Sequence, residues 1–292
     1  MDNLLMKKMN DSPLISVNEL FAQDDPNLPR VCDCRFLLTQ PDAGRAQYLA
    51  SHIPGASYVD LETDLSGPVG PRTGRHPLPE VGVFRATLGR LGLTPDIPLV
   101  VYDDGGCAMA ARFWWMLRWM GHSDVKVLDG GFAAWQAAGF ASSSGNETYQ
   151  SAIYEGIVDD DLWVSVETVE LIAGEASGLI VDAREASRFK GWQEPLDLVA
   201  GHIPSAVNRP FVENMREGQF KPTRELRQAF EALLEAQSPR DVIHSCGSGV
   251  TACHNLLAME HAGLPGSRLF VGSWSEWITD QQRQVVVEPN DS

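Results

Sequence analysis

Short apolar runs closed by polar residues alternate along the chain with stretches of helical spacing. Runs of this length are typical of buried strands, whereas apolar positions three and four apart indicate helices. A helix with an aromatic face is expected over 108–120, and a long loop over the Gly- and Pro-rich stretch 66–79. The strands expected in the first half lie at 14–17, 30–35, 99–103 and 125–129, with another after the Pro-Gly turn at 51–58. Strands that alternate with helices predict an α/β fold class with a mostly parallel sheet.

A polar segment without periodicity, at 141–160, separates the two halves and is interpreted as a linker. After it, the order of the first half returns. The matched blocks are 179–184 with 30–35, 201–206 with 51–56, the stretch around Cys246 with 102–106, and 271–277 with 129–135. Such an ordered set of matches indicates an internal duplication. We therefore expect two domains, at 13–140 and 161–288, each with a mostly parallel sheet flanked by helices.

Length, charge and cysteine content limit the number of domains, the partners and the compartment that we expect. A length of 292 residues fits two ordinary domains, and no apolar run is long enough to cross a bilayer. The formal charge of −16 argues against nucleic acid and anionic membranes as partners. The N-terminal residues do not have the pattern of a signal peptide. Five cysteines, without the spacing of a disulfide framework, are typical of a reducing cytoplasm.

The stretch from Asp241 to His254 carries the clearest candidate for chemistry. It predicts a buried strand, then a tight turn with Gly247 and Gly249, then a helix. A turn of this kind can aim several backbone N–H groups at one point, and a helix N-terminus adds partial positive charge there. Both effects favour thiolate over thiol, so the sequence predicts that Cys246 is a nucleophile.

The loop Cys246–Ala252, which reads CGSGVTA, resembles the active-site loop of the mercaptopyruvate sulfurtransferases in the tandem rhodanese family. The thiosulfate-preferring members share its second half but carry Arg and Lys where Gly247 and Ser248 stand. The resemblance implies two tandem rhodanese-like domains with one active site, in the second domain. It also implies transfer of sulfane sulfur from 3-mercaptopyruvate or thiosulfate, through a Cys246 persulfide, to cyanide, a thiol or a thioredoxin-like protein. No metal or organic cofactor is expected.

The resemblance carries site residues with it. Arg188 matches the family's substrate-binding arginine for an anionic donor, and Arg184 matches a nearby arginine with a structural or supporting role. The family's second substrate arginine is replaced by Leu196, which leaves open whether 3-mercaptopyruvate or thiosulfate is preferred. Arg209 is the candidate to compensate. The loop residues expected to stabilise the persulfide are Gly247, Ser248, Gly249, Val250 and Thr251.

The resemblance also implies a proton relay, built from residues of both domains at their interface. Ser248 matches its serine, His76 its histidine, and Glu62 its acid, with Asp60 as the alternative acid. Three such groups could move a proton to or from the substrate. The repeated His52 and His202, each before an Ile-Pro pair, are interpreted as structural residues.

Aligning the two halves places Asp104 where the second half has Cys246. A carboxylate cannot carry sulfur as a persulfide, so the first domain is predicted to be catalytically silent. Two other functions remain open. A Cdc25-type phosphatase would use a similar cysteine, although the loop 247–251 has no basic residue to neutralise phosphate. A sulfur carrier that serves a single protein partner is the other alternative.

Overall fold

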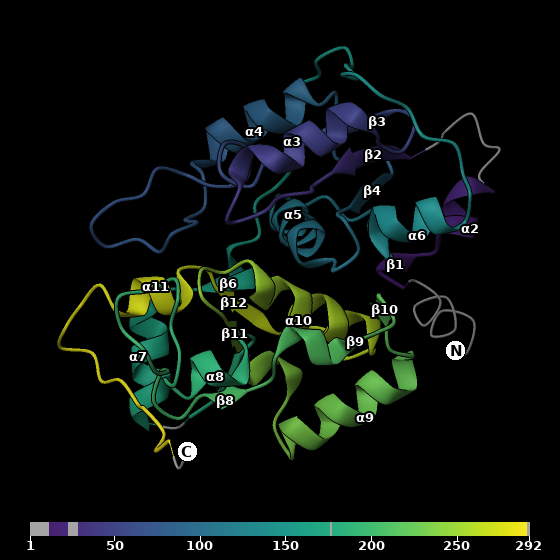
Figure 1. Ribbon diagram of the computed structural model, residues 1–292. Helices are drawn as coiled ribbons and strands as arrows, with labels where there is room; N and C mark the ends of the chain where they lie inside the picture. Colours follow the sequence, from purple (N-terminus) through teal and green to yellow (C-terminus); the bar gives the residue numbers. More distant parts are fainter. Residues whose placement is uncertain (1–11, 23–28, 176, 291–292) are drawn as a thin grey trace, which may run out of the picture.

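Two parallel sheets of five strands each form the framework of the molecule (Figure 1). The computed structural model describes residues 12–22, 29–175 and 177–290. The first sheet has the order β1-β5-β4-β2-β3 and the second the order β6-β12-β11-β7-β8. The strands of the first sheet are β1 Leu14–Ile15, β2 Arg30–Asp33, β3 Ala56–Tyr58, β4 Leu99–Tyr102 and β5 Val125–Leu128. Those of the second are β6 Trp163–Val164, β7 Leu179–Asp182, β8 Val207–Asn208, β11 Val242–Ser245 and β12 Arg268–Phe270.

The matching strand orders confirm the predicted α/β class and the internal duplication. Within both sheets every described pairing is parallel. An antiparallel hairpin of β9 Met215–Arg216 and β10 Gln219–Phe220 lies outside them. Parallel strands collect their carboxyl ends at one edge of a sheet, where ligands of open α/β folds bind.

Helices cover the sheets and meet between them. The α-helices are α2 Val17–Phe21, α3 Pro41–Ala50, α4 Val81–Arg90, α5 Ala108–Trp119, α6 Gly131–Ala137, α7 Val166–Glu175, α8 Ala186–Phe189, α9 Thr223–Leu234, α10 Thr251–His261 and α11 Ser273–Trp277. Short 3₁₀ turns lie at Asp160–Leu162, Phe211–Asn214 and Pro239–Asp241. Helices α5 and α10 pack against each other at the centre, one from each half (Figure 1). No helix in the described part of the chain is long and apolar enough to span a membrane.

Helix α5 is buried on nearly all sides. Its tryptophans at 114, 115 and 119 are at most 4% exposed, and they share one apolar cluster with Leu257 and Met259 of α10. A helix that is apolar all round belongs in the interior of a protein. The junction of the two halves is therefore a continuous hydrophobic core, and α5 carries one charged residue, Arg112, into it fully buried.

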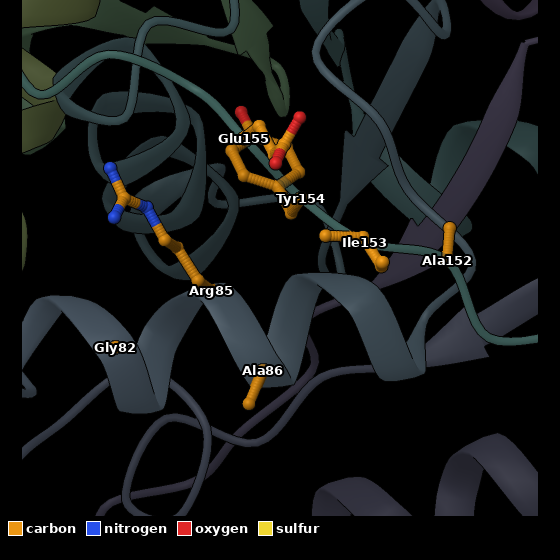
Figure 2. A pocket seen from close by; sticks show the side chains of 7 residues that line it. All are labelled: Gly82, Arg85, Ala86, Ala152, Ile153, Tyr154 and Glu155. Atoms are coloured by element: carbon orange, nitrogen blue, oxygen red, sulfur yellow. The ribbon is translucent and has the colours of Figure 1, made fainter.

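The segment 141–160 follows the first half closely. His52 and Ser143 form a bridge, Tyr149 donates its hydroxyl to the Gly55 carbonyl at 2.5 Å, and the Ala152 N–H donates to the Gly89 carbonyl at 2.9 Å. A cavity of about 540 Å³ lies between α4 and Ala152–Glu155, and Figure 2 shows the side chains that line it. The segment therefore has no helix or strand up to residue 159, as its polar composition predicts, although hydrogen bonds fix the path of its backbone.

The strand register corrects one step of the alignment between the halves. Asp33 pairs with Tyr102 in the first sheet, and Asp182, its counterpart, pairs with Ser245 in the second. The next residue in each loop is therefore Asp103 or Cys246, so the prediction of Asp104 was wrong by one position. The sequence alignment treated Ser245 as the counterpart of Asp103. Ser245 is instead the buried last residue of its strand, and a slip of one residue turns every side chain to the other face.

Candidate active site

Cys246 lies at the carboxyl end of β11, immediately before the turn that leads into α10. The residue is 2% exposed, and its Sγ accepts the N–H of Gly249 at 3.1 Å. The Cys246 N–H donates to the Ser273 hydroxyl at 3.1 Å, which fixes the start of the turn. An amide aimed at sulfur stabilises the thiolate and any persulfide anion formed on it.

Gly249 makes this turn possible. Its φ is +77°, a left-handed backbone conformation, and a Cβ at this position would lie 2.1 Å from the carbonyl oxygen of Val271. No residue with a side chain fits without displacing the turn. The Gly249 N–H therefore points at sulfur because this position has no side chain.

The first half contains the same turn with a carboxylate in the place of sulfur. The Asp103 carboxylate accepts N–H groups from Gly105 at 3.0 Å, Cys107 at 2.8 Å, Met109 at 3.0 Å and Ala110 at 3.3 Å. Burial raises the pKa of Asp103, while these four amides act in the opposite direction. The chain thus holds an internal example of the turn binding an acidic group through its backbone.

Ser248 and His76 are brought together across the domain interface, as predicted. His76 Nδ1 lies 2.8 Å from the Ser248 hydroxyl oxygen, and both side chains are buried. Burial lowers the pKa of His76 to about 4, and the guanidinium groups of Arg112 and Arg75 act in the same direction. The imidazole is neutral at pH 7 and can accept a proton from a hydroxyl or return one.

The acid of the predicted relay does not reach this pair. Glu62 is exposed, and its backbone N–H donates to Asp60 at 2.9 Å. Within the described ranges, no hydrogen bond or ion pair joins Glu62 or Asp60 to His76. The prediction of Glu62, taken from the family's pattern, was wrong, because Glu62 is a surface carboxylate whereas His76 is buried in the interface.

Arg112 is a site residue that sequence reasoning missed. Its Nη1 donates to the Gly249 carbonyl and its Nη2 to the His76 carbonyl, both at 3.1 Å. Burial lowers the pKa of Arg112, whereas the sulfurs of Cys253 and Cys246 raise it. This guanidinium joins the histidine loop of the first half to the cysteine loop of the second. Its only sequence signal was a charge in the middle of a largely apolar helix.

Arg184 has the contacts of a structural residue. The side chain is 1% exposed, its Nη2 pairs with Asp182 at 2.7 Å, and it also donates to the Gly201 carbonyl at 2.8 Å. Arg35 makes the same pair of contacts in the first half, with Asp33 and with the Ser51 carbonyl, both at 2.6 Å. A role repeated in both halves belongs to the scaffold.

Arg188 lies at the mouth of the site. Its side chain is 14% exposed, and its Nη2 contacts Glu194 at 2.6 Å and Asp197 at 3.2 Å. Arg209 does not compensate for Leu196, because its guanidinium contacts Asn214 and Glu213 and stacks over the Phe230 ring.

The second guanidinium beside the cysteine loop is that of Arg75, which sequence reasoning also missed. A Cβ on Gly247 would lie 2.9 Å from Arg75 Nη2. The Arg75 N–H donates to the Ser275 hydroxyl at 3.0 Å, which docks the loop 66–79 (blue in Figure 1) near α11. Burial lowers the pKa of Arg75, and Cys246 opposes this shift.

The repeated histidines have matching structural contacts. His52 Nδ1 lies 2.7 Å from the Tyr48 carbonyl, and His202 Nδ1 lies 2.8 Å from the Phe189 carbonyl. In the described part of the chain, no three His, Cys, Asp or Glu side chains converge as metal ligands would. The cavity beside α4 in Figure 2 contains no nucleophilic cysteine or serine.

Comparison with known proteins gives a consistent result. The model of the rhodanese-like domain matches residues 16–138 and 165–280. The chain is 45% identical over 281 residues to a Pseudomonas aeruginosa protein named "Probable 3-mercaptopyruvate sulfurtransferase", covering 95% of this chain and 99% of that protein. It is 35% identical over 255 residues to the thiosulfate sulfurtransferase of Gallus gallus, covering 85% and 86%. The crystal structure of SseA from Escherichia coli, described as a 3-mercaptopyruvate sulfotransferase, superposes with a TM-score of 0.79 at 35% identity, covering 91% of this chain and 100% of that one.

Proposed function

The chain belongs to the tandem rhodanese family of sulfurtransferases, and we propose that Cys246 carries the transferred sulfur as a persulfide. The observation that carries this proposal is the 3.1 Å contact from the Gly249 N–H to Cys246 Sγ at a strand end. An amide in this position favours the anionic forms of sulfur that the reaction requires. We also propose that catalysis belongs to the second domain, 161–288, because the domain at 13–140 has Asp103 at the corresponding position.

The first half of the reaction takes sulfur from the donor. With 3-mercaptopyruvate, the Cys246 thiolate attacks the donor sulfur and forms an S–S bond, while the C–S bond breaks. Its electron pair remains with the three-carbon fragment as the enolate of pyruvate, which takes up a proton. With thiosulfate, attack on the outer sulfur releases sulfite. Each route leaves a Cys246 persulfide without a cofactor.

The second half returns the enzyme to its starting state. A thiophile such as cyanide or a thiolate attacks the outer sulfur, so that thiocyanate or a new persulfide leaves and the Cys246 thiolate is restored. We propose that His76, acting through the Ser248 hydroxyl, takes the thiol proton of the donor as the C–S bond breaks and returns it to the enolate. Their 2.8 Å contact supports this role, since a neutral imidazole can accept a proton through the serine hydroxyl and give it back.

The donor is a small anion, and the acceptor is a thiol, cyanide or a thioredoxin-like protein. We propose the cytoplasm as the compartment, because the mechanism needs a reduced cysteine and all five cysteines are free. The mercaptopyruvate donor is favoured by the loop itself, in which Gly247 and Ser248 stand at the positions after the nucleophile.

The test is sulfur transfer to cyanide, followed as thiocyanate, with 3-mercaptopyruvate and thiosulfate compared in parallel. We expect a larger kcat/KM for 3-mercaptopyruvate and no transfer by Cys246→Ser. Cys253→Ser is the matched control, because Cys253 is also buried but donates to the Gly249 carbonyl from the following helix. Transfer by Cys246→Ser near the parent rate would refute the assignment.

A further inference from the structure

We propose that Arg75, from the first domain, is the second guanidinium that binds the carboxylate of the donor, and that Asp197 occupies its place until the donor binds. The inference rests on the proposed function and names the group that selects the donor. It also accounts for Leu196, which cannot pair with an anion and is 46% exposed.

Two guanidinium groups border the residue that follows the nucleophile. A Cβ on Gly247 would lie 2.9 Å from Arg75 Nη2 and 3.6 Å from both Nη1 and Nη2 of Arg188. The space beside Cys246 is therefore lined by one arginine from each domain. Any larger side chain at Gly247 would push into this space, so the bare glycine is what admits the guanidinium of Arg75.

A carboxylate already lies between these two arginines. One oxygen of Asp197 pairs with Arg75 Nη1, and the other lies 3.2 Å from Arg188 Nη2. The Asp197 side chain is only 4% exposed. The pair of guanidinium groups is thus spaced to hold one carboxylate, with one oxygen on each arginine.

The segment that carries Asp197 is held weakly on either side of it. Residues 193–200 contain no helix or strand, and the neighbouring Leu198 is fully exposed. The N–H groups of Leu196 and Asp197 donate to Glu194 at 3.0 and 3.2 Å, and the next described anchor is the Val199 carbonyl, which accepts the indole N–H of Trp274 at 2.9 Å. Apart from the two arginine contacts of Asp197, which a donor carboxylate would replace, few contacts of the segment oppose its outward movement.

Replacing Asp197 by a donor carboxylate keeps the charge of the site constant. Arg188 retains Glu194 as a partner, at 2.6 Å, during the exchange. A donor without a carboxylate would instead leave Arg75 without an anion once Asp197 had moved. Arg75 therefore selects carboxylate donors over neutral ones.

The test measures binding without turnover, in the Cys246→Ser background, by isothermal titration calorimetry. The probes are 3-mercaptopyruvate and mercaptoacetone, which carries a methyl group in place of the carboxylate. Arg75→Gln should weaken binding of 3-mercaptopyruvate about tenfold or more and change binding of mercaptoacetone less than about twofold. Arg72→Gln, which removes the same charge from an exposed position of the same loop, is the matched control and should change neither.

Asp197→Asn should change the affinity for 3-mercaptopyruvate in the opposite direction. Removing the competing anion should tighten binding of 3-mercaptopyruvate by about threefold. In the active enzyme, Arg75→Gln should raise the KM for 3-mercaptopyruvate and leave kcat within about twofold. A structural role for Arg75 would weaken both probes equally, and this result, or no effect on either, overturns the inference. Failure of the parent enzyme to transfer sulfur, with these binding differences intact, would refute the proposed function alone.

Discussion

The two glycines of the cysteine loop should control different kinetic constants. In Gly249→Ala, the left-handed backbone costs a residue with a side chain about 1–2 kcal/mol. The new Cβ would also lie 2.1 Å from the Val271 carbonyl oxygen, so the turn must shift. That shift breaks the 3.1 Å contact to Cys246 Sγ and the 3.1 Å contact from Arg112.

A hydrogen bond to a charged group contributes about 1.5–3 kcal/mol. Loss of the amide that faces sulfur should therefore lower kcat about 10- to 100-fold, with little change in the donor KM. The free energy of unfolding, from urea titration, should fall by about 2–4 kcal/mol. The assay is steady-state transfer to cyanide at saturating donor.

Gly247→Ala is the control within the same loop. Gly247 does not have a left-handed backbone, and its Cβ would meet the flexible tips of Arg75, at 2.9 Å, and Arg188, at 3.6 Å. We expect a raised KM with kcat and stability nearly unchanged. Equal effects of the two substitutions, or a Gly249→Ala enzyme with parental kcat, would contradict the geometry of the turn.

Two further predictions concern protons. Ser248→Ala and His76→Ala should lower kcat by similar factors, and the double variant should be no worse than either, because the two side chains act through one 2.8 Å contact. Glu62→Gln is the control and should leave kcat unchanged. If the two effects multiply in the double variant, the two side chains act independently. Burial lowers the pKa of His76 to about 4 and of His244 and His254 to about 3, so below the unfolded value of about 6.5 the unfolded chain binds more protons. The stability that these neutral histidines contribute is present above about pH 6.5 and is lost as the pH falls toward 4. Urea titrations should show a decrease in the free energy of unfolding of about 4 kcal/mol between pH 7 and pH 5.5. Equal free energies at the two pH values would show that the histidines are not buried in the neutral form.

The parts of the site that are local in sequence could be predicted, and the parts that depend on packing could not. Cys246 stood between a strand pattern and a helix pattern, so its place at a sheet edge followed from periodicity. Asp103 was missed by one residue because apolar runs mark a strand without fixing where it ends. Arg75 and Arg112 were missed because their partners are about 122 and 137 positions away along the chain.

The predicted proton relay also shows that contacts that depend on packing are hard to predict from sequence. Ser248 and His76 were paired correctly from the family pattern, although they are 172 positions apart. Glu62 came from the same pattern, but its exposure depends on how the 59–66 turn packs, which no spacing rule encodes. Resemblance transferred the pair that lies in the buried interface and failed for the residue on the surface.

The contacts of Arg112 have a consequence for how the molecule unfolds. Its guanidinium donates to a carbonyl in each half, and it is fully buried in their shared core. If the halves separated, both of these hydrogen bonds would break and the apolar core that α5 shares with α10 would be exposed to water. Partial opening is therefore disfavoured, and melting should be a single cooperative transition in calorimetry, with equal calorimetric and van't Hoff enthalpies. The first domain is then retained as half of one folding unit.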